Sequence, residues 1–242
     1  MSLIIVVYVR EGIVMAADSR LTLTFPRILP DGTQQFLSVT SSDSAKKLFL
    51  APNNVGIATC GVADIGGVPV AGFVESFIVE KLKNQAIGPI EVANELKLYF
   101  QNLSVRPGTI FQVAGYCSNA SGLEQIVFYI DPAADTIVRL NQPNSQGANW
   151  NGEIDVLQRL YNDLLIPQPN AQQPISLPAH GIPFEFFTLQ DALDFAVHGI
   201  RSTIESIRFQ QREKTVGGPI DILVIQPDSS QWISQKNIVP PV

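Results

Sequence analysis

Charged residues are scarce in this sequence of 242 residues. They make up 16% of the chain, against about a quarter in an average soluble domain, while hydrophobic residues make up 45%. The net charge is −6, and the 16 Lys and Arg residues are scattered, so the sequence offers no basic patch for nucleic acid. A surface with so few charges is typical of a subunit that partner chains partly cover.

Cysteine and histidine are rarer still. Cys60 and Cys117 have no metal-binding spacing, and they predict a reducing, cytoplasmic compartment. With only His180 and His198, a zinc site or a Ser-His-Asp triad has few candidates, and we expect no metal and no cofactor. The apolar run at 3–9 is too short for a membrane span and lacks the basic leader of a signal peptide, so we expect no membrane association.

Two β-rich runs open the chain. Residues 3–9 (LIIVVYV) and 13–17 (IVMAA) flank Arg10, Glu11 and Gly12, which predicts a hairpin with a short turn. Neither run alternates polar with apolar residues. Both faces of their sheet should therefore be covered by other layers.

The rest of the chain predicts strands, a helix pair, strands, a second helix pair and final strands. Helices are expected at 68–84, 89–103, 150–164 and 188–209, and strands at 45–51, 55–60, 109–117, 124–130, 135–140, 217–228 and 230–234. A four-layer αββα sandwich, with two antiparallel sheets between helices, satisfies this order. We expect one domain, 1–242, with a polar insertion at 21–44 and a Pro-rich loop at 166–183.

A nucleophile at a chain terminus carries its own base. The free α-amino group has a pKa of about 7.7–8.0, so it can take the proton from the hydroxyl of its own residue. Ser2 would become such a nucleophile if Met1 were removed. The site also needs a carboxylate, a lysine whose charge lowers the pKa of the amine, and an N–H that faces the developing oxyanion.

The sequence places a carboxylate and a lysine near Ser2. Asp18 lies at the far end of the second run, and an antiparallel hairpin returns that end to Ser2. Lys46 and Lys47 lie in the next strand, where alternation sends only one of the two side chains to the site. Taken singly, each is also compatible with an ordinary surface residue; their joint spacing favours a catalytic group.

The residues Cys60 and Gly61 lie where a strand breaks into a turn before a helix. A backbone N–H at this point is placed to bind an oxyanion. The alternative for Cys60 and Cys117 is buried apolar packing.

The segments GIVMAADSR, AKKLF, VGIATCGVAD and GGPIDILVI, in this order, resemble the proteasome β-subunit family and its bacterial proteasome-like relatives, the N-terminal nucleophile (Ntn) hydrolases. The match runs over most of the chain. The resemblance implies an αββα sandwich, amide-bond hydrolysis and a ring or related homo-oligomer. It also assigns the family's site residues: the nucleophile to Ser2, the aspartate to Asp18, the arginine to Arg20, the lysine to Lys47, the oxyanion residue to Cys60 and a substrate-backbone contact to Thr22.

The sequence departs from the family where supporting polar residues are expected. The nucleophile is serine, where the family has threonine. Gly147–Gly152 offers Asn149 or Asn151 in place of a serine, and His180 occurs near Gly181 without an aspartate.

These observations predict a cytoplasmic, bacterial, threonine-peptidase-like endopeptidase whose substrates are peptides or unfolded proteins. Two alternatives remain open. One is an inactive proteasome-like scaffold or binding protein, and the other is an Ntn amidase acting on small amides. An open groove beside Thr22 and Cys60 would favour peptides, a closed cavity small amides, and a blocked groove the scaffold.

Overall fold

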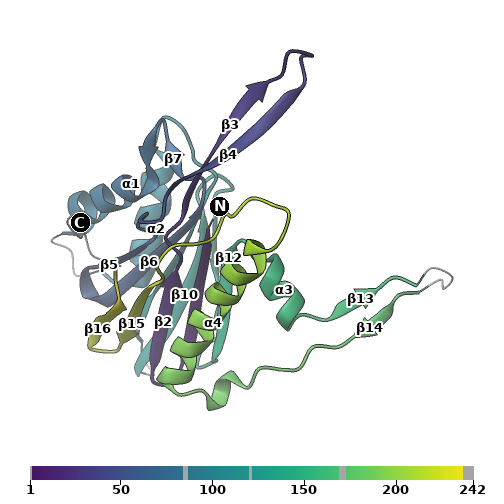
Figure 1. Cartoon of the computed structure of the whole chain (residues 1–242). Helices are drawn as coiled ribbons and strands as arrows, with labels where there is room; N and C mark the ends of the chain where they lie inside the picture. The colour runs from purple at the N-terminus through teal and green to yellow at the C-terminus, as the bar shows by residue number, and fades with distance from the viewer. Residues whose placement is uncertain (1, 84–86, 120–121, 169–172, 237–242) are drawn as a thin grey trace, which may run out of the picture.

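Two five-stranded antiparallel sheets form the body of the molecule (Figure 1). The computed structural model describes residues 2–83, 87–119, 122–168 and 173–236. The strand order in the first sheet is β12 (Gly147–Gly152), β1 (Leu3–Val9), β2 (Gly12–Ala17), β15 (Asp221–Gln226) and β16 (Ser229–Ser234). In the second sheet it is β11 (Thr136–Arg139), β10 (Gly122–Asp131), β9 (Thr109–Asn119), β6 (Val55–Gly61) and β5 (Leu48–Ala51).

The helices of the described part lie against these sheets. They are α1 (Val70–Phe77), which continues as a π-helical turn over Ile78–Leu82, α2 (Pro89–Gln101), α3 (Asp155–Tyr161) and α4 (Leu189–Arg208), with 3-10 turns at Pro52–Asn54 and Phe184–Phe186. Thr188 caps α4, because its hydroxyl accepts the Asp191 N–H at 3.2 Å. A short hairpin of β7 (Asp64–Ile65) and β8 (Val68–Pro69) leads into α1.

Strand β1 is buried on both faces, as its unalternated sequence predicts. One set of its side chains packs with the apolar face of α4, including Leu3, Ile5 and Val7. The other set, including Ile4 and Val6, packs against side chains of the second sheet. The period of two along the strand therefore divides a continuous apolar run between two separate cores.

The second sheet buries its other face against α1 and α2. Phe111 of β9 meets Phe100 of α2, with ring centroids 4.5 Å apart. Phe49 and Ile57 from β5 and β6 join the same cluster with Phe77 of α1. This packing fixes the ends of β5 and β6, which carry candidate site residues.

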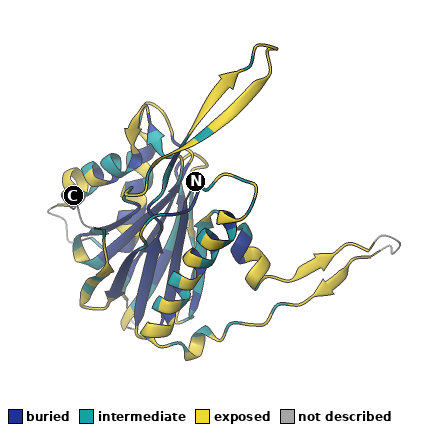
Figure 2. Cartoon of the chain, in the orientation of Figure 1, coloured by how far each residue is buried: buried dark blue, intermediate teal, exposed yellow. Residues whose placement is uncertain are grey.

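Two hairpins project from the body (Figures 1 and 2). The first arm is β3 (Leu21–Ile28) paired with β4 (Gln34–Ser42), and the second arm is β13 (Leu164–Ile166) paired with β14 (Ile175–Leu177). Each of these strands pairs only with its own partner strand within the described residues. The sequence predicts a polar insertion at 21–44 and a Pro-rich loop at 166–183, without strands. The structure corrects both expectations, because each arm is a two-stranded hairpin.

The helix expected at 150–164 is also wrong in its bounds. Residues Gly147–Gly152 form the edge strand β12, and the helix α3 covers only Asp155–Tyr161. Gly-Ala-Asn-Trp-Asn-Gly has weak strand propensity, and antiparallel pairing with β1 overrides it.

Candidate functional site

Asp18 lies fully buried directly after β2 and accepts several backbone N–H groups. Its Oδ1 accepts from Leu3 at 2.9 Å, and its Oδ2 accepts from Arg20 at 3.1 Å and from Gly217 at 3.0 Å. The antiparallel pairing of β1 with β2 brings this end of the hairpin back beside Leu3. The carboxylate is thus held in a fixed place, because it accepts the N–H of Leu3, the residue that follows Ser2.

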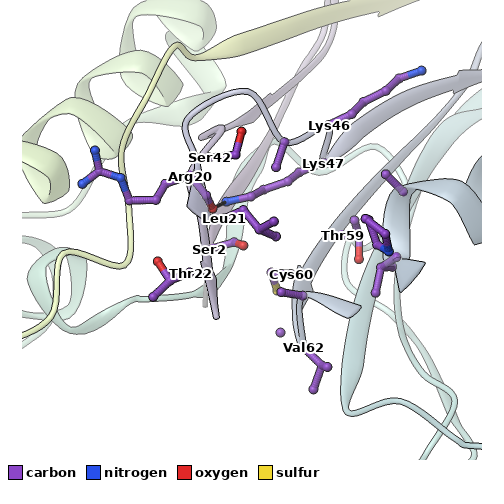
Figure 3. Close-up of a pocket in the computed structure, with 16 residues that line it drawn as sticks. Ser2, Arg20, Leu21, Thr22, Ser42, Lys46, Lys47, Thr59, Cys60 and Val62 are labelled. Atoms are coloured by element: carbon purple, nitrogen blue, oxygen red, sulfur yellow. Dashed lines mark hydrogen bonds between the residues drawn. The ribbon is translucent and has the colours of Figure 1, made fainter. Parts of the chain in front are cut away.

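Lys47 completes this buried cluster. Its Nζ donates to Oδ1 of Asp18 at 2.8 Å and to the backbone oxygen of Arg20 at 2.5 Å. Burial lowers the pKa of the Lys47 amino group, and the charge of Asp18 opposes this shift. Figure 3 shows the Lys47 side chain extending toward Ser2.

The neighbouring Lys46 points elsewhere. Its Nζ donates to Glu75 at 2.8 Å near the surface and lies 4.9 Å from the ring centroid of Phe49. One lysine of the pair therefore reaches Asp18 and the other reaches helix α1, so only Lys47 joins the site. Both lysines directly precede β5, so the strand expected at 45–51 is shorter than predicted and begins at Leu48.

Arg20 ties the site to the first arm. Its Nε and Nη2 donate to the two carboxylate oxygens of Asp43 at 2.6 and 2.8 Å. Because Arg20 directly precedes β3 and Asp43 directly follows β4, this bidentate pair closes the base of the arm. The Arg20 guanidinium lowers the pKa of the Asp43 carboxyl.

Ser2 is buried and held by its backbone. Its carbonyl oxygen accepts the Glu153 N–H at 2.8 Å. Gly152 has φ +104°, and a Cβ there would lie 1.8 Å from the Ser2 oxygen. Met1, whose removal a nucleophilic Ser2 requires, lies outside the described residues.

Ser2 opens onto a pocket of about 350 Å³. Four further segments line it: the root of the first arm (Arg20, Leu21, Thr22 and Ser42), residues 45–47, the end of β6 with the following turn (59–63), and the start of α1 (69–71). Figure 3 shows Cys60 and Leu21 near Ser2, with Thr59 on another wall. The structure thus brings Ser2, Lys47, Cys60, Gly61, Arg20 and Thr22 to one cavity, with Asp18 buried behind it.

The end of β6 carries the two candidate oxyanion residues. Burial raises the pKa of the Cys60 thiol to about 12, against the opposing effect of the Lys47 charge. Gly61 has φ +111°, and a Cβ there would lie 2.5 Å from the Gly108 oxygen. This position therefore requires glycine.

Two buried hydroxyl groups in the pocket have no hydrogen-bond partner among the described residues. They are Oγ1 of Thr22 and Oγ1 of Thr59. The sequence pattern points to Thr22 but not to Thr59, whose only sequence signal is its place next to Cys60. It does not point to Gly217 either, whose N–H donates to Asp18 from 199 residues further along the chain.

The two asparagines expected in place of the family's supporting serine form hydrogen bonds outside the pocket. Asn149 donates to the Tyr8 hydroxyl at 3.3 Å, and Asn151 accepts from Gln112 at 2.7 Å. Neither lines the pocket, and the exposed His180 does not line it either. Within the described residues, no group of three or more His, Cys, Asp or Glu side chains is arranged to hold a metal ion.

The sheets and their helices form a mixed α/β fold. No protein-family model matches the chain, and no curated protein matches it. Among solved structures, the chain is similar to a mutant of Anbu from Hyphomicrobium sp. strain MC1, with a TM-score of 0.61 and 15% identity over 98% of this chain and 89% of that chain. At this identity the likeness shows the fold alone. In the described residues no helix is long and apolar enough to cross a membrane.

Proposed function

We propose that this chain is an Ntn hydrolase that cleaves peptide bonds with Ser2, after removal of Met1. The observation that supports this most is the buried ion pair of Lys47 with Asp18 at a pocket that Ser2 lines. We infer as well that the two sheets and their helices form a four-layer αββα sandwich in one domain, 1–242. The site residues are those that the sequence assigned.

In this mechanism the Ser2 Oγ attacks the carbonyl carbon of the substrate amide. Its proton passes to the Ser2 α-amine and then to the leaving nitrogen, as the C–N bond breaks. Water hydrolyses the resulting ester, releases the acid and restores the hydroxyl. Asp18 keeps Lys47 in place, and the ammonium of Lys47 lowers the pKa of the α-amine, so that more of it is neutral.

The end of β6 supplies the oxyanion site. The N–H of Cys60 or Gly61 donates to the oxygen that gains charge during attack. A backbone donor serves here whatever the side chain, so the buried Cys60 thiol takes no proton-transfer role. Thr22, in β3 at the root of the first arm, would pair through its backbone with an extended peptide in the pocket. Because β3 pairs only with β4 within the described residues, its other edge is left for such a peptide.

Intact mass and covalent labelling test this function. Protein purified from its native host should lack the mass of one methionine, and a peptide epoxyketone or β-lactone should add to Ser2. Ser2→Ala and Lys47→Ala should each reduce peptide turnover by several orders of magnitude. Lys97→Ala is the control and should retain activity, because Lys97 lies on α2 outside the pocket and loses only a partly exposed ion pair with Asp135.

Other results would identify the two remaining alternatives. A mature protein that keeps Met1 has no free amine on Ser2, which leaves the inactive scaffold or binding protein. Turnover of small amides without turnover of peptides identifies the Ntn amidase.

We further propose that copies of the chain associate into a ring or ring-like homo-oligomer in the cytoplasm. Both arms expose large apolar side chains: Phe25, Ile28, Phe36, Leu37 and Val39 on the first, and Leu164, Leu165, Ile166, Ile175 and Leu177 on the second. Isolated two-stranded hairpins are marginally stable in water. Contact with a neighbouring copy would cover these side chains.

A further inference from the structure

The wall of the pocket holds a hydroxyl group that lacks a partner. Thr59 is 5% exposed, and its Oγ1 has no hydrogen-bond partner among the described residues. Its backbone is fixed, because its N–H donates to the Lys47 oxygen at 2.9 Å. A buried hydroxyl without a partner loses its hydrogen bonds to water and gains none in return. Such a group in a binding pocket indicates a ligand that pairs with it.

One side of the pocket is apolar. The turn after β6 and the start of α1 supply it, through Val62, Ala63, Pro69, Val70 and Ala71. A wall of this kind packs well against hydrocarbon and poorly against a charged group. The pocket therefore suits a side chain with an apolar body.

The charges at the pocket favour a neutral side chain. Three cationic residues line it, and each is already paired: Arg20 with Asp43, Lys46 with Glu75 and Lys47 with Asp18. No Asp or Glu is among the described residues that line it. A basic side chain would enter without a counter-ion, and an acidic one would have to break an existing ion pair.

We propose that this pocket binds a neutral substrate side chain with an apolar body and a polar end, of the Asn or Gln type, which pairs with Oγ1 of Thr59. This inference rests on the proposed function, because the side chain belongs to the residue whose carbonyl carbon Ser2 attacks. An amide end satisfies the hydroxyl as donor or as acceptor. An apolar side chain of the same shape would bury the hydroxyl unpaired.

Matched peptides test the preference. Two pairs of fluorogenic tripeptides differ only in the residue before the scissile bond, Asn against Leu and Gln against Met. In the wild-type protein, the polar member of at least one pair should have a kcat/KM about tenfold higher than its apolar partner. NMR titration of the Ser2→Ala variant with the corresponding acetyl-tripeptide amides measures the binding affinity of each peptide. It gives the same comparison within each pair without turnover.

Substitution at Thr59 then assigns the effect. Thr59→Val keeps the shape and removes the hydroxyl, so the ratio within the pair should fall to about one. Thr59→Ser should retain most of the ratio. Thr136→Val, in β11 and outside the pocket, is the matched control and should not change it. Circular dichroism of each variant establishes that it is folded.

The outcomes separate this inference from the proposed function. The inference is overturned, and the hydrolase remains, if the Leu and Met peptides have a kcat/KM equal to or higher than that of their Asn and Gln partners. It is also overturned if the kcat/KM ratio within the pair is unchanged in Thr59→Val. A binding difference that Thr59→Val abolishes, without any turnover, supports the inference and overturns the hydrolase. Absence of both binding and turnover overturns both.

Discussion

The Cys60 thiol should be unreactive in the folded protein. Burial raises its pKa to about 12, so at pH 8 only about one thiol in ten thousand is the reactive thiolate. Cys117 is partly exposed on β9. We therefore expect an aromatic disulfide reagent at pH 8 to titrate one thiol per folded chain and two per chain in denaturant.

The sign of the pH effect follows from the raised pKa. As pH rises from 9.0, the ordinary pKa of a cysteine thiol, toward 12, the unfolded chain loses the Cys60 proton before the folded chain does. Stability should therefore fall over this range, and Cys60→Ala should lessen the fall. Rapid labelling of Cys60 at pH 8 in folded protein would contradict the prediction, and Cys117→Ala identifies which thiol reacts.

At the scale of residues, the short hairpin of β1 and β2 suffices to return Asp18 to Leu3, because it acts over a few residues. The contact of Lys47 with Asp18 joins residues 29 apart in the sequence, and the order and spacing of the family's segments pointed to it. The contacts of Gly217 and Thr59 were not predictable in this way. Gly217 reaches Asp18 only after the whole fold has formed. The Thr59 hydroxyl has no hydrogen-bond partner because none of the described groups around it bonds to it, and this too is known only from the folded structure.

At the scale of elements, strands with continuous apolar sequence were predicted close to their bounds. Residues 3–9 are β1, and the Thr-capped helix expected at 188–209 is α4 over Leu189–Arg208. The arms were missed because their strands are exposed. The sequence from 21 to 44 carries no buried run that would signal a sheet, and the register of β3 with β4 comes from pairing alone.

We expect the end of β12 to control the position of Ser2. Alanine substitutions at two glycines, Gly152 and Gly122, test this. Gly152 and Gly122 have similar dihedral angles, φ +104° and +116°, so an alanine is strained at either position. Only at Gly152 does the added Cβ also meet backbone, at 1.8 Å from the Ser2 oxygen, whereas nothing lies within 4 Å at Gly122.

Gly152→Ala should therefore lower stability by clearly more than the roughly 1–2 kcal/mol expected for Gly122→Ala. It should also displace Ser2 and reduce peptide turnover at least a hundredfold. Urea unfolding and kcat/KM measure the two effects. Equal losses in both variants would show that β12 does not hold Ser2 in place.

At the scale of the whole molecule, the scarcity of charge and the two arms point to the same property. The second arm, from Leu164 to Leu177, contains no Asp, Glu, Lys or Arg in its sequence. Its strands pair only with each other within the described residues, so the body does little to cover them. Composition alone predicted a covered surface, and the structure shows which segments leave apolar side chains uncovered.

Light scattering at micromolar protein tests the self-association that follows. The wild-type chain should have a mass that is a multiple of 26.4 kDa. Replacing residues 165–176 by a short Gly-Ser turn removes most of the exposed apolar side chains of the second arm, and it should lower the mass toward that of one chain. Because the Ala179 N–H and the Asp163 carboxylate, 2.9 Å apart, close the base of this arm outside the deletion, the body should stay folded and unfold cooperatively. Its unfolding midpoint should fall only by the part that association contributes in the wild-type protein. A wild-type protein of 26.4 kDa would rule out self-association under these conditions, and an unchanged oligomer after the deletion would assign the interface to other surfaces.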